Sequence, residues 1–192
     1  MGKLLTLQIA GVIFFIGSTH VSAQTNQSAS HNISIVIPEV ALLDLESSST
    51  SSFTTGPSVP SEAGDALDFT EAVNDQLWVN YSSVIGSSEP ERRVSAFIEG
   101  TIPEGVVVSV VASPYSGEGK GKTGIPSGKV ILSNTPQDII TNIGSCYTGD
   151  GIHNGHQLTY TVELDKTAGS YAKLNFDEST TVSVTYTLSD NN

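Results

Sequence analysis

The stretch TTVSVTYTL, residues Thr180–Leu188, decides the fold class. Its apolar side chains are those of Val182, Val184, Tyr186 and Leu188, and hydroxyl side chains stand between them. Successive side chains of a β-strand point to opposite faces, so this spacing places the apolar groups on one face and the hydroxyl groups on the other. β-Branched and aromatic residues suit such a half-buried surface. The stretch therefore predicts a strand whose apolar face packs on a core.

The same alternation recurs along most of the chain. It predicts strands at His31–Ile37, Val40–Leu45, Gly64–Phe69, Gln76–Val84, Glu91–Glu99, Val106–Ala112, Gly128–Leu132, His156–Leu164 and Tyr171–Phe176. Pro136–Ile143 fits either a strand or a single helical turn. The segments Ser113–Ser127 and Gly144–Gly155 are rich in glycine and predict loops. Glu46–Ala63, which is rich in Ser, Thr, Gly and Pro, predicts a long surface loop or a weak edge strand. We expect an all-β, immunoglobulin-like two-sheet sandwich of about eight or nine strands, with a closed barrel as the alternative.

The N-terminus has the features of a secretory signal. Lys3 precedes the apolar run Leu4–Gly17, and Val21-Ser22-Ala23 supplies small residues at the spacing that signal peptidases accept. We predict a signal peptide at residues 1–23. The mature chain is then a single domain, residues 24–192, that starts with a flexible polar lead at residues 24–30. Because no second apolar span follows, we expect a secreted, cell-surface or periplasmic protein without a membrane span after cleavage.

The formal net charge of the chain is −12. Such a charge argues against nucleic acid and against anionic lipid surfaces as partners. Cys146 is the single cysteine, so no disulfide can form within the chain. We expect its thiol to be buried as a small apolar group.

One segment gathers the residue types that metals and nucleophilic catalysis use. Cys146, Asp150, His153 and His156 lie within eleven residues of one another, and thiolates with imidazoles bind zinc or copper. The segment lacks CxxC and HxxxH spacing, and its Asp-Gly and Asn-Gly dipeptides are equally typical of tight turns. We therefore predict no catalytic set, no cofactor and no enzymatic activity, and keep these four residues as weak metal candidates.

Aromatic residues provide a second kind of candidate site. Trp78 and Tyr147, with Tyr81 and Tyr115, could stack on sugar rings and make the protein a glycan-binding or adhesin-type module. A core position for the Trp78 indole is the competing interpretation.

The early alternating residues Ile33, Ile35 and Ile37 suggest a third possibility, assembly. A signal peptide, a polar lead, an early alternating strand and an all-β body together resemble bacterial pilin subunits and spore-coat-U-like secreted proteins. The resemblance implies an incomplete immunoglobulin-like fold, which the N-terminal strand of an identical or related subunit completes by adding to an exposed edge. Two features depart from pilins: the single cysteine, and the terminal LSDNN, which lacks a penultimate aromatic. Alternatively, Ile33–Ile37 is the first strand of its own sandwich.

The predicted function is an exported structural or cell-surface protein, with glycan binding as the alternative.

Overall fold

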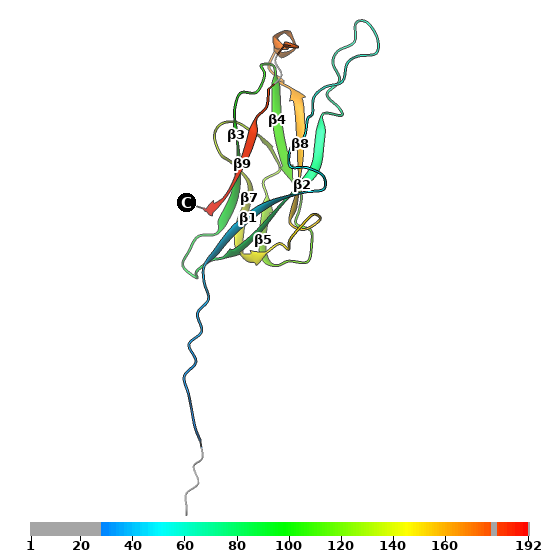
Figure 1. Cartoon of the computed structure of the whole chain (residues 1–192). Helices are drawn as coiled ribbons and strands as arrows, with labels where there is room; N and C mark the ends of the chain where they lie inside the picture. The colour runs from blue at the N-terminus through cyan, green and yellow to red at the C-terminus, as the bar shows by residue number, and fades with distance from the viewer. Residues whose placement is uncertain (1–27, 178–179, 192) are drawn as a thin grey trace, which may run out of the picture. The chain divides into compact units, whose positions relative to one another are not determined.

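The computed structural model describes residues 28–177 and 180–191, and shows an all-β chain (Figure 1). Its strands are β1 (Val40–Ser47), β2 (Val73–Val84), β3 (Arg92–Glu99), β4 (Val106–Ala112), β5 (Lys120–Pro126), β6 (Lys129–Ile131), β7 (Gln137–Tyr147), β8 (His156–Leu164) and β9 (Ser183–Asp190). The one helix in the described residues is the short 3-10 helix η1 (Ser170–Lys173). The predicted all-β class is therefore confirmed. The predicted signal peptide, residues 1–23, lies outside the described residues.

Residues 37–192 form one compact unit, and the residues before them form a second unit. Within the second unit, residues 28–36 are exposed and have no regular secondary structure. No helix among the described residues has the length and apolar character needed to cross a bilayer.

The strands form one antiparallel sheet, in which one edge of β2 pairs first with β8 and then with β7. The first half of β2 pairs with β8, and Ser82 and Ser83 near its end pair with β7. The path of the sheet is β6-β4-β8-β2-β7-β3-β9, with β1 added beside β2 and β5 beside β7. As a result, β1 pairs with β2 alone and β9 pairs with β3 alone.

The core is made by the apolar face of the alternating strands. Leu77, Val79 and Tyr81 of β2 are almost fully buried, and they join residues of β3, β4, β7 and β8 in one cluster. The apolar residues of the predicted last strand, Val182 to Leu188, pack against this cluster and are partly buried. The alternation in the sequence therefore assigned the core face of this strand correctly.

Two of the predicted loops contain strand. Ser113–Ser127 includes β5, and Gly144–Tyr147 belongs to β7. The glycines of β5 permit close approach rather than flexibility: a Cβ on Gly121 would lie 2.3 Å from the Ser145 carbonyl oxygen. A glycine-rich sequence can thus form a strand where two backbones nearly touch. The segment Pro136–Ile143, for which the sequence allowed either a strand or a helical turn, is a strand, because β7 begins at Gln137.

Three predicted strands are wrong. His31–Ile37 forms no strand, because it pairs with no other strand in the described part of the chain. Tyr171–Phe176 contains the end of η1, because Gly169 adopts a left-handed conformation and the Ser170 hydroxyl donates to the Thr167 carbonyl. Gly64–Phe69 contains only a single bridge, between Ser58 and Asp68.

Candidate functional site: the seam between β1 and β9

The candidate site lies between the two edge strands β1 and β9. Leu43 and Leu45 of β1 and Val184, Tyr186 and Leu188 of β9 pack against the core, yet all five side chains remain partly exposed. We call this set of five residues the seam. Leucine and valine are among the residues most often fully buried in a core, and tyrosine is intermediate. The seam is therefore a place where the core is incompletely covered.

Both strands that flank the seam have a free backbone edge. All eight residues of β1 pair with β2, and all eight of β9 pair with β3, through one edge of each strand. Within residues 28–177 and 180–191, no ladder forms on the second edge of either strand. A free edge offers unpaired N–H and C=O groups to another strand. The seam thus combines apolar side chains with backbone groups that can extend a sheet.

The other outer strands carry features that discourage such pairing. Lys120, Lys122 and Pro126 lie on β5, and Lys129 lies on β6. Lysine and proline on an edge strand oppose edge-to-edge association. The sequences of β1 (VALLDLES) and β9 (SVTYTLSD) contain neither residue type. The two edges that border the seam therefore lack lysine and proline, and the charged residues of these strands are Asp44 and Glu46 of β1 and Asp190 of β9.

One polar atom in the seam lacks a partner. The hydroxyl oxygen of Tyr186 is buried and makes no hydrogen bond in the described part of the chain. Leaving a buried polar group unsatisfied costs about 1–3 kcal/mol.

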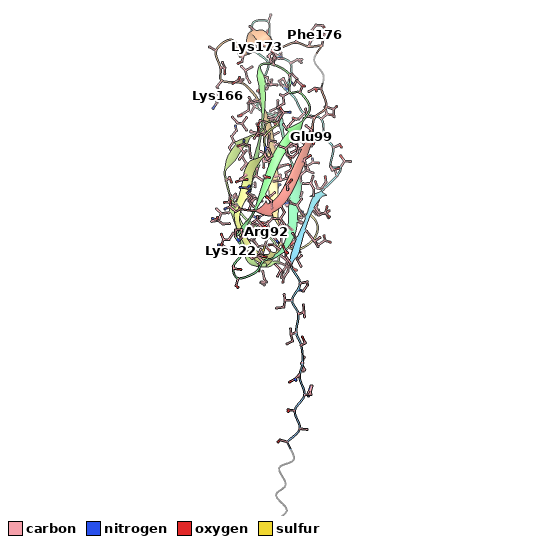
Figure 2. All side chains as sticks on the ribbon, turned by 90° about the vertical axis from the view of Figure 1, so that its left-hand side faces the viewer. Arg92, Glu99, Lys122, Lys166, Lys173 and Phe176 are labelled. Atoms are coloured by element: carbon pink, nitrogen blue, oxygen red, sulfur yellow. The ribbon has the colours of Figure 1, made fainter. Side chains whose placement is uncertain are left out.

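Arg92 closes one end of the seam. Its Nε donates to Asp190 Oδ1 at 3.1 Å, at the end of β9, while its other nitrogens donate to the Val40 carbonyl and to the Glu39 carboxylate at the start of β1. Figure 2 shows Arg92 beside the end of β9. The Arg92 side chain is 3% exposed, but Glu39 and Asp190 remain largely exposed. This Arg92 clamp holds the ends of β1 and β9 together, and no comparable contact joins the described residues of these strands farther along.

The N-terminal segment presents a matching apolar face. Ile33, Ile35 and Ile37 are 74%, 83% and 77% exposed. Alternate residues of an extended chain lie on one face, so the three side chains form one apolar stripe. Val36, which is 83% exposed, lies on the opposite face. The segment that the sequence singled out is thus extended and available.

The four weak metal candidates do not come together. Cys146 is buried in β7 and His156 is fully buried in β8, whereas Asp150 and His153 are exposed in the connection between these strands. Among the described residues, no group of three or more His, Cys, Asp or Glu side chains is arranged to hold a metal ion. Burial raises the pKa of the Cys146 thiol to about 11, so this group is a poor nucleophile.

His156 instead forms part of a buried hydrogen-bond network. Its Nδ1 lies 2.7 Å from the Ser113 carbonyl oxygen, and its Nε2 lies 2.9 Å from the Tyr81 hydroxyl and 3.2 Å from the Thr123 carbonyl oxygen. Each ring nitrogen thus faces a carbonyl oxygen, which can only accept a hydrogen bond. Burial lowers the pKa of His156, although the two carbonyls oppose this effect. The imidazole thus links β2, β5 and β8 to the segment that follows β4.

The aromatic candidates differ in exposure, and two of the four are buried. Trp78 is 6% exposed on the outer face of β2, where the His153 ring packs edge-on at a centroid distance of 5.0 Å. Tyr147 is 50% exposed, and Tyr81 is buried in the core. The Tyr115 hydroxyl donates to the Thr148 carbonyl. These four side chains therefore do not form one stacking platform.

No protein-family model, curated protein or solved structure matches this chain. The seam geometry is accordingly the main basis for assigning a function.

Sequence reasoning missed two features of this site, the Arg92 clamp and the unpartnered hydroxyl of Tyr186. Arg92 stands in phase with Val94, Ala96 and Ile98, the apolar face of β3. This position could have indicated the clamp, because a charged residue on the core face of a strand needs buried hydrogen-bond or ionic partners. The unpartnered hydroxyl of Tyr186 had no such signal, since its absence of a partner depends on the tertiary arrangement.

Proposed function

We propose that this protein is an exported structural subunit of the cell surface, which assembles when the Ile33–Ile37 segment of one copy adds as a strand to the seam of another. The single observation that carries the proposal is the seam itself: an apolar, incompletely covered strip between two free strand edges. The proposed role is non-enzymatic. The signal-peptide pattern at residues 1–23 and the resemblance to pilin and spore-coat-U-like proteins support export and assembly.

The segment and the seam agree in period and length. Alternate residues of a strand are about 6.6–6.8 Å apart, so the three isoleucines have the same spacing as Val184, Tyr186 and Leu188. The eight residues of β9 exceed the five of Ile33–Ile37, so one strand edge accommodates the whole stripe. Added in this way, the segment would cover the seam on its apolar face and satisfy the free edge of β9 with backbone hydrogen bonds.

The proposal also assigns a layered architecture to the body. In it, β6-β4-β8-β2-β1 forms one layer of an immunoglobulin-like sandwich and β5-β7-β3-β9 forms the other. Two observations support this arrangement: β2 and β7 change partners along their length, and side chains from both sets of strands share one cluster. The seam is then the side on which the sandwich lacks a strand.

A peptide-complementation experiment tests the proposed function. The mature chain lacking residues 24–37 is titrated with a synthetic peptide of residues 28–39, and binding and thermal stability are measured. We expect the deletion variant to stay folded and monomeric, and to gain thermal stability when the peptide binds. The matched control peptide carries Asn in place of the three isoleucines and should not bind. A folded deletion variant that ignores the wild-type peptide, or that binds both peptides equally, would rule out the proposal.

A further inference from the structure

We propose that Pro38, together with the Arg92 clamp, prevents the Ile33–Ile37 segment from closing the seam of its own chain, so that the occupant must come from a second copy. This inference rests on the proposed function and concerns the choice of partner at the same site. It follows from the short connection between Ile37 and Val40 and from the face of β1 that points to the core.

The most direct way for a chain to close its own seam is a hairpin, in which the chain reverses direction before β1 and pairs along the free edge of β1. The tightest reversal is a hairpin with Pro38 and Glu39 as its two loop residues. Two-residue hairpins use type I′ or II′ turns, which require a positive φ at the first loop residue. Proline is fixed near −65° and cannot adopt it. The sequence therefore excludes the tightest hairpin.

The same hairpin would also place the isoleucine side chains on the face of β1 that points away from the core. Its pairs would be Ile37 with Val40, Ile35 with Leu42 and Ile33 with Asp44, and cross-strand partners point to the same side of a sheet. Leu42 is 66% exposed and Asp44 is exposed, whereas Leu43 and Leu45 are the residues that pack on the core. The isoleucines would thus point away from the core, and a four-residue loop has the same defect.

A loop of three residues restores the correct face but meets a second obstacle. With Ile37, Pro38 and Glu39 in the loop, Ile35 would pair with Ala41 and Ile33 with Leu43. This hairpin places Pro38 at the second central position of a type I turn, where proline is disfavoured. It also requires Glu39 in a left-handed conformation. A five-residue loop leaves only Ile33 in the seam.

The Arg92 clamp prevents the chain from avoiding these turns by shifting β1. Arg92 holds the Glu39 carboxylate and the Val40 carbonyl, and these two residues directly follow Pro38. Val40 is also paired with Val84 at the start of the β1–β2 ladder. The reversal must therefore occur within the residues before Val40. A segment from a second copy has no connection to this β1 and meets none of these restrictions.

The experiment removes the block by changing the turn in the full mature chain. The test variant carries Pro38→Asn with one glycine inserted after it, which supplies an Asn-Gly turn and pairs Ile35 with Ala41. The control variant carries Pro38→Asn and Glu39→Gly, which supplies the same turn but pairs Ile35 with Leu42. A Glu39→Gly variant alone reports the effect of losing the contact with Arg92. Oligomeric state is measured by light scattering, and amide hydrogen exchange of residues 33–37 is measured on dilute monomer.

We expect the test variant to be a closed monomer in which these amides exchange at least about tenfold more slowly than in the wild type. In the control variant and in the wild-type monomer the amides should stay unprotected. Equal exchange in the test and control variants, or protected amides in the wild-type monomer, would overturn the inference. Because exchange is measured on monomers, these outcomes are separate from failure of the proposed function. That failure would appear as wild-type protein that does not assemble and a deletion variant that does not bind the peptide.

Discussion

Replacing one isoleucine in the N-terminal segment should weaken assembly without changing the stability of the body. Ile35 is 83% exposed in the single chain, so almost its whole side chain is available for burial in a neighbouring seam. Ile35→Ala removes about three methylene equivalents, each worth about 0.8 kcal/mol when buried. The expected loss is thus about 2 kcal/mol, which corresponds to a roughly 30-fold weaker association. The free energy of unfolding of the monomer should change by no more than about 0.5 kcal/mol, since the residue is exposed there.

Val36→Ala is the matched control. Val36 is equally exposed and lies next to Ile35, but on the opposite face of the extended segment. In an added strand it would face solvent, so its replacement should change association less than about threefold. Both variants are compared with the wild type by sedimentation velocity over a range of concentrations, and by urea unfolding of the monomer. Equal weakening by the two substitutions, or no weakening by Ile35→Ala, would refute the reasoning from strand periodicity.

Three further predictions concern the body. Arg92→Met should lower the free energy of unfolding, measured in urea, by about 1–3 kcal/mol. The Val40 carbonyl loses its donor, whereas the carboxylates of Glu39 and Asp190 are exposed and can be solvated by water. Unchanged stability would mean that the Arg92 clamp is not formed. His156 is buried with its pKa lowered from the ordinary value of 6.5, so the unfolded chain takes up its proton first on acidification. The free energy of unfolding should therefore fall as the pH drops below about 6.5, by up to about 1.4 kcal/mol per pH unit. Chemical denaturation at several pH values should show a smaller fall for a His156→Gln variant. An equal dependence of stability on pH in the variant and the wild type would contradict this assignment. Burial raises the pKa of Cys146 from 9.0 to about 11, which leaves roughly 100-fold less thiolate at neutral pH. Alkylation by iodoacetamide, followed by mass spectrometry, should therefore be slow in the native protein and fast in denaturant, and rapid native labelling would show that the thiol is accessible.

Much of the strand content could be predicted from alternation, because a half-buried strand must place apolar residues on one side. Val106–Ala112 and His156–Leu164 were predicted with the bounds that the structure shows. The alternation of His31–Ile37 predicted a strand, but the segment is exposed and unpaired in the described chain. A period of two shows which side chains share a face, and it does not show which other strand covers that face. β5 was missed because its glycines serve close contact with β7, a tertiary requirement that local propensity does not encode.

The candidate site was less accessible to sequence reasoning. The sequence singled out Ile33, Ile35 and Ile37, and their function as an assembly strand remains a prediction. The seam depends on which strands end at a sheet edge, and this topology arises from long-range pairing that no local pattern contains. The cluster of Cys146, Asp150, His153 and His156 is close in sequence but divided between a buried network and an exposed connection.

The most direct test of strand addition between copies is disulfide trapping. In a Cys146→Ala background, protein carrying Ile35→Cys is mixed with a size-tagged copy carrying a single cysteine substitution in β9. Cross-linking requires Cα atoms about 4.4–6.8 Å apart and side chains on the same face. We predict cross-linked products between tagged and untagged copies for at least one of Val184→Cys, Tyr186→Cys and Leu188→Cys, and none for Thr185→Cys or Thr187→Cys. Cross-links that form with both faces alike, or no cross-link at any of the five positions, would contradict the account.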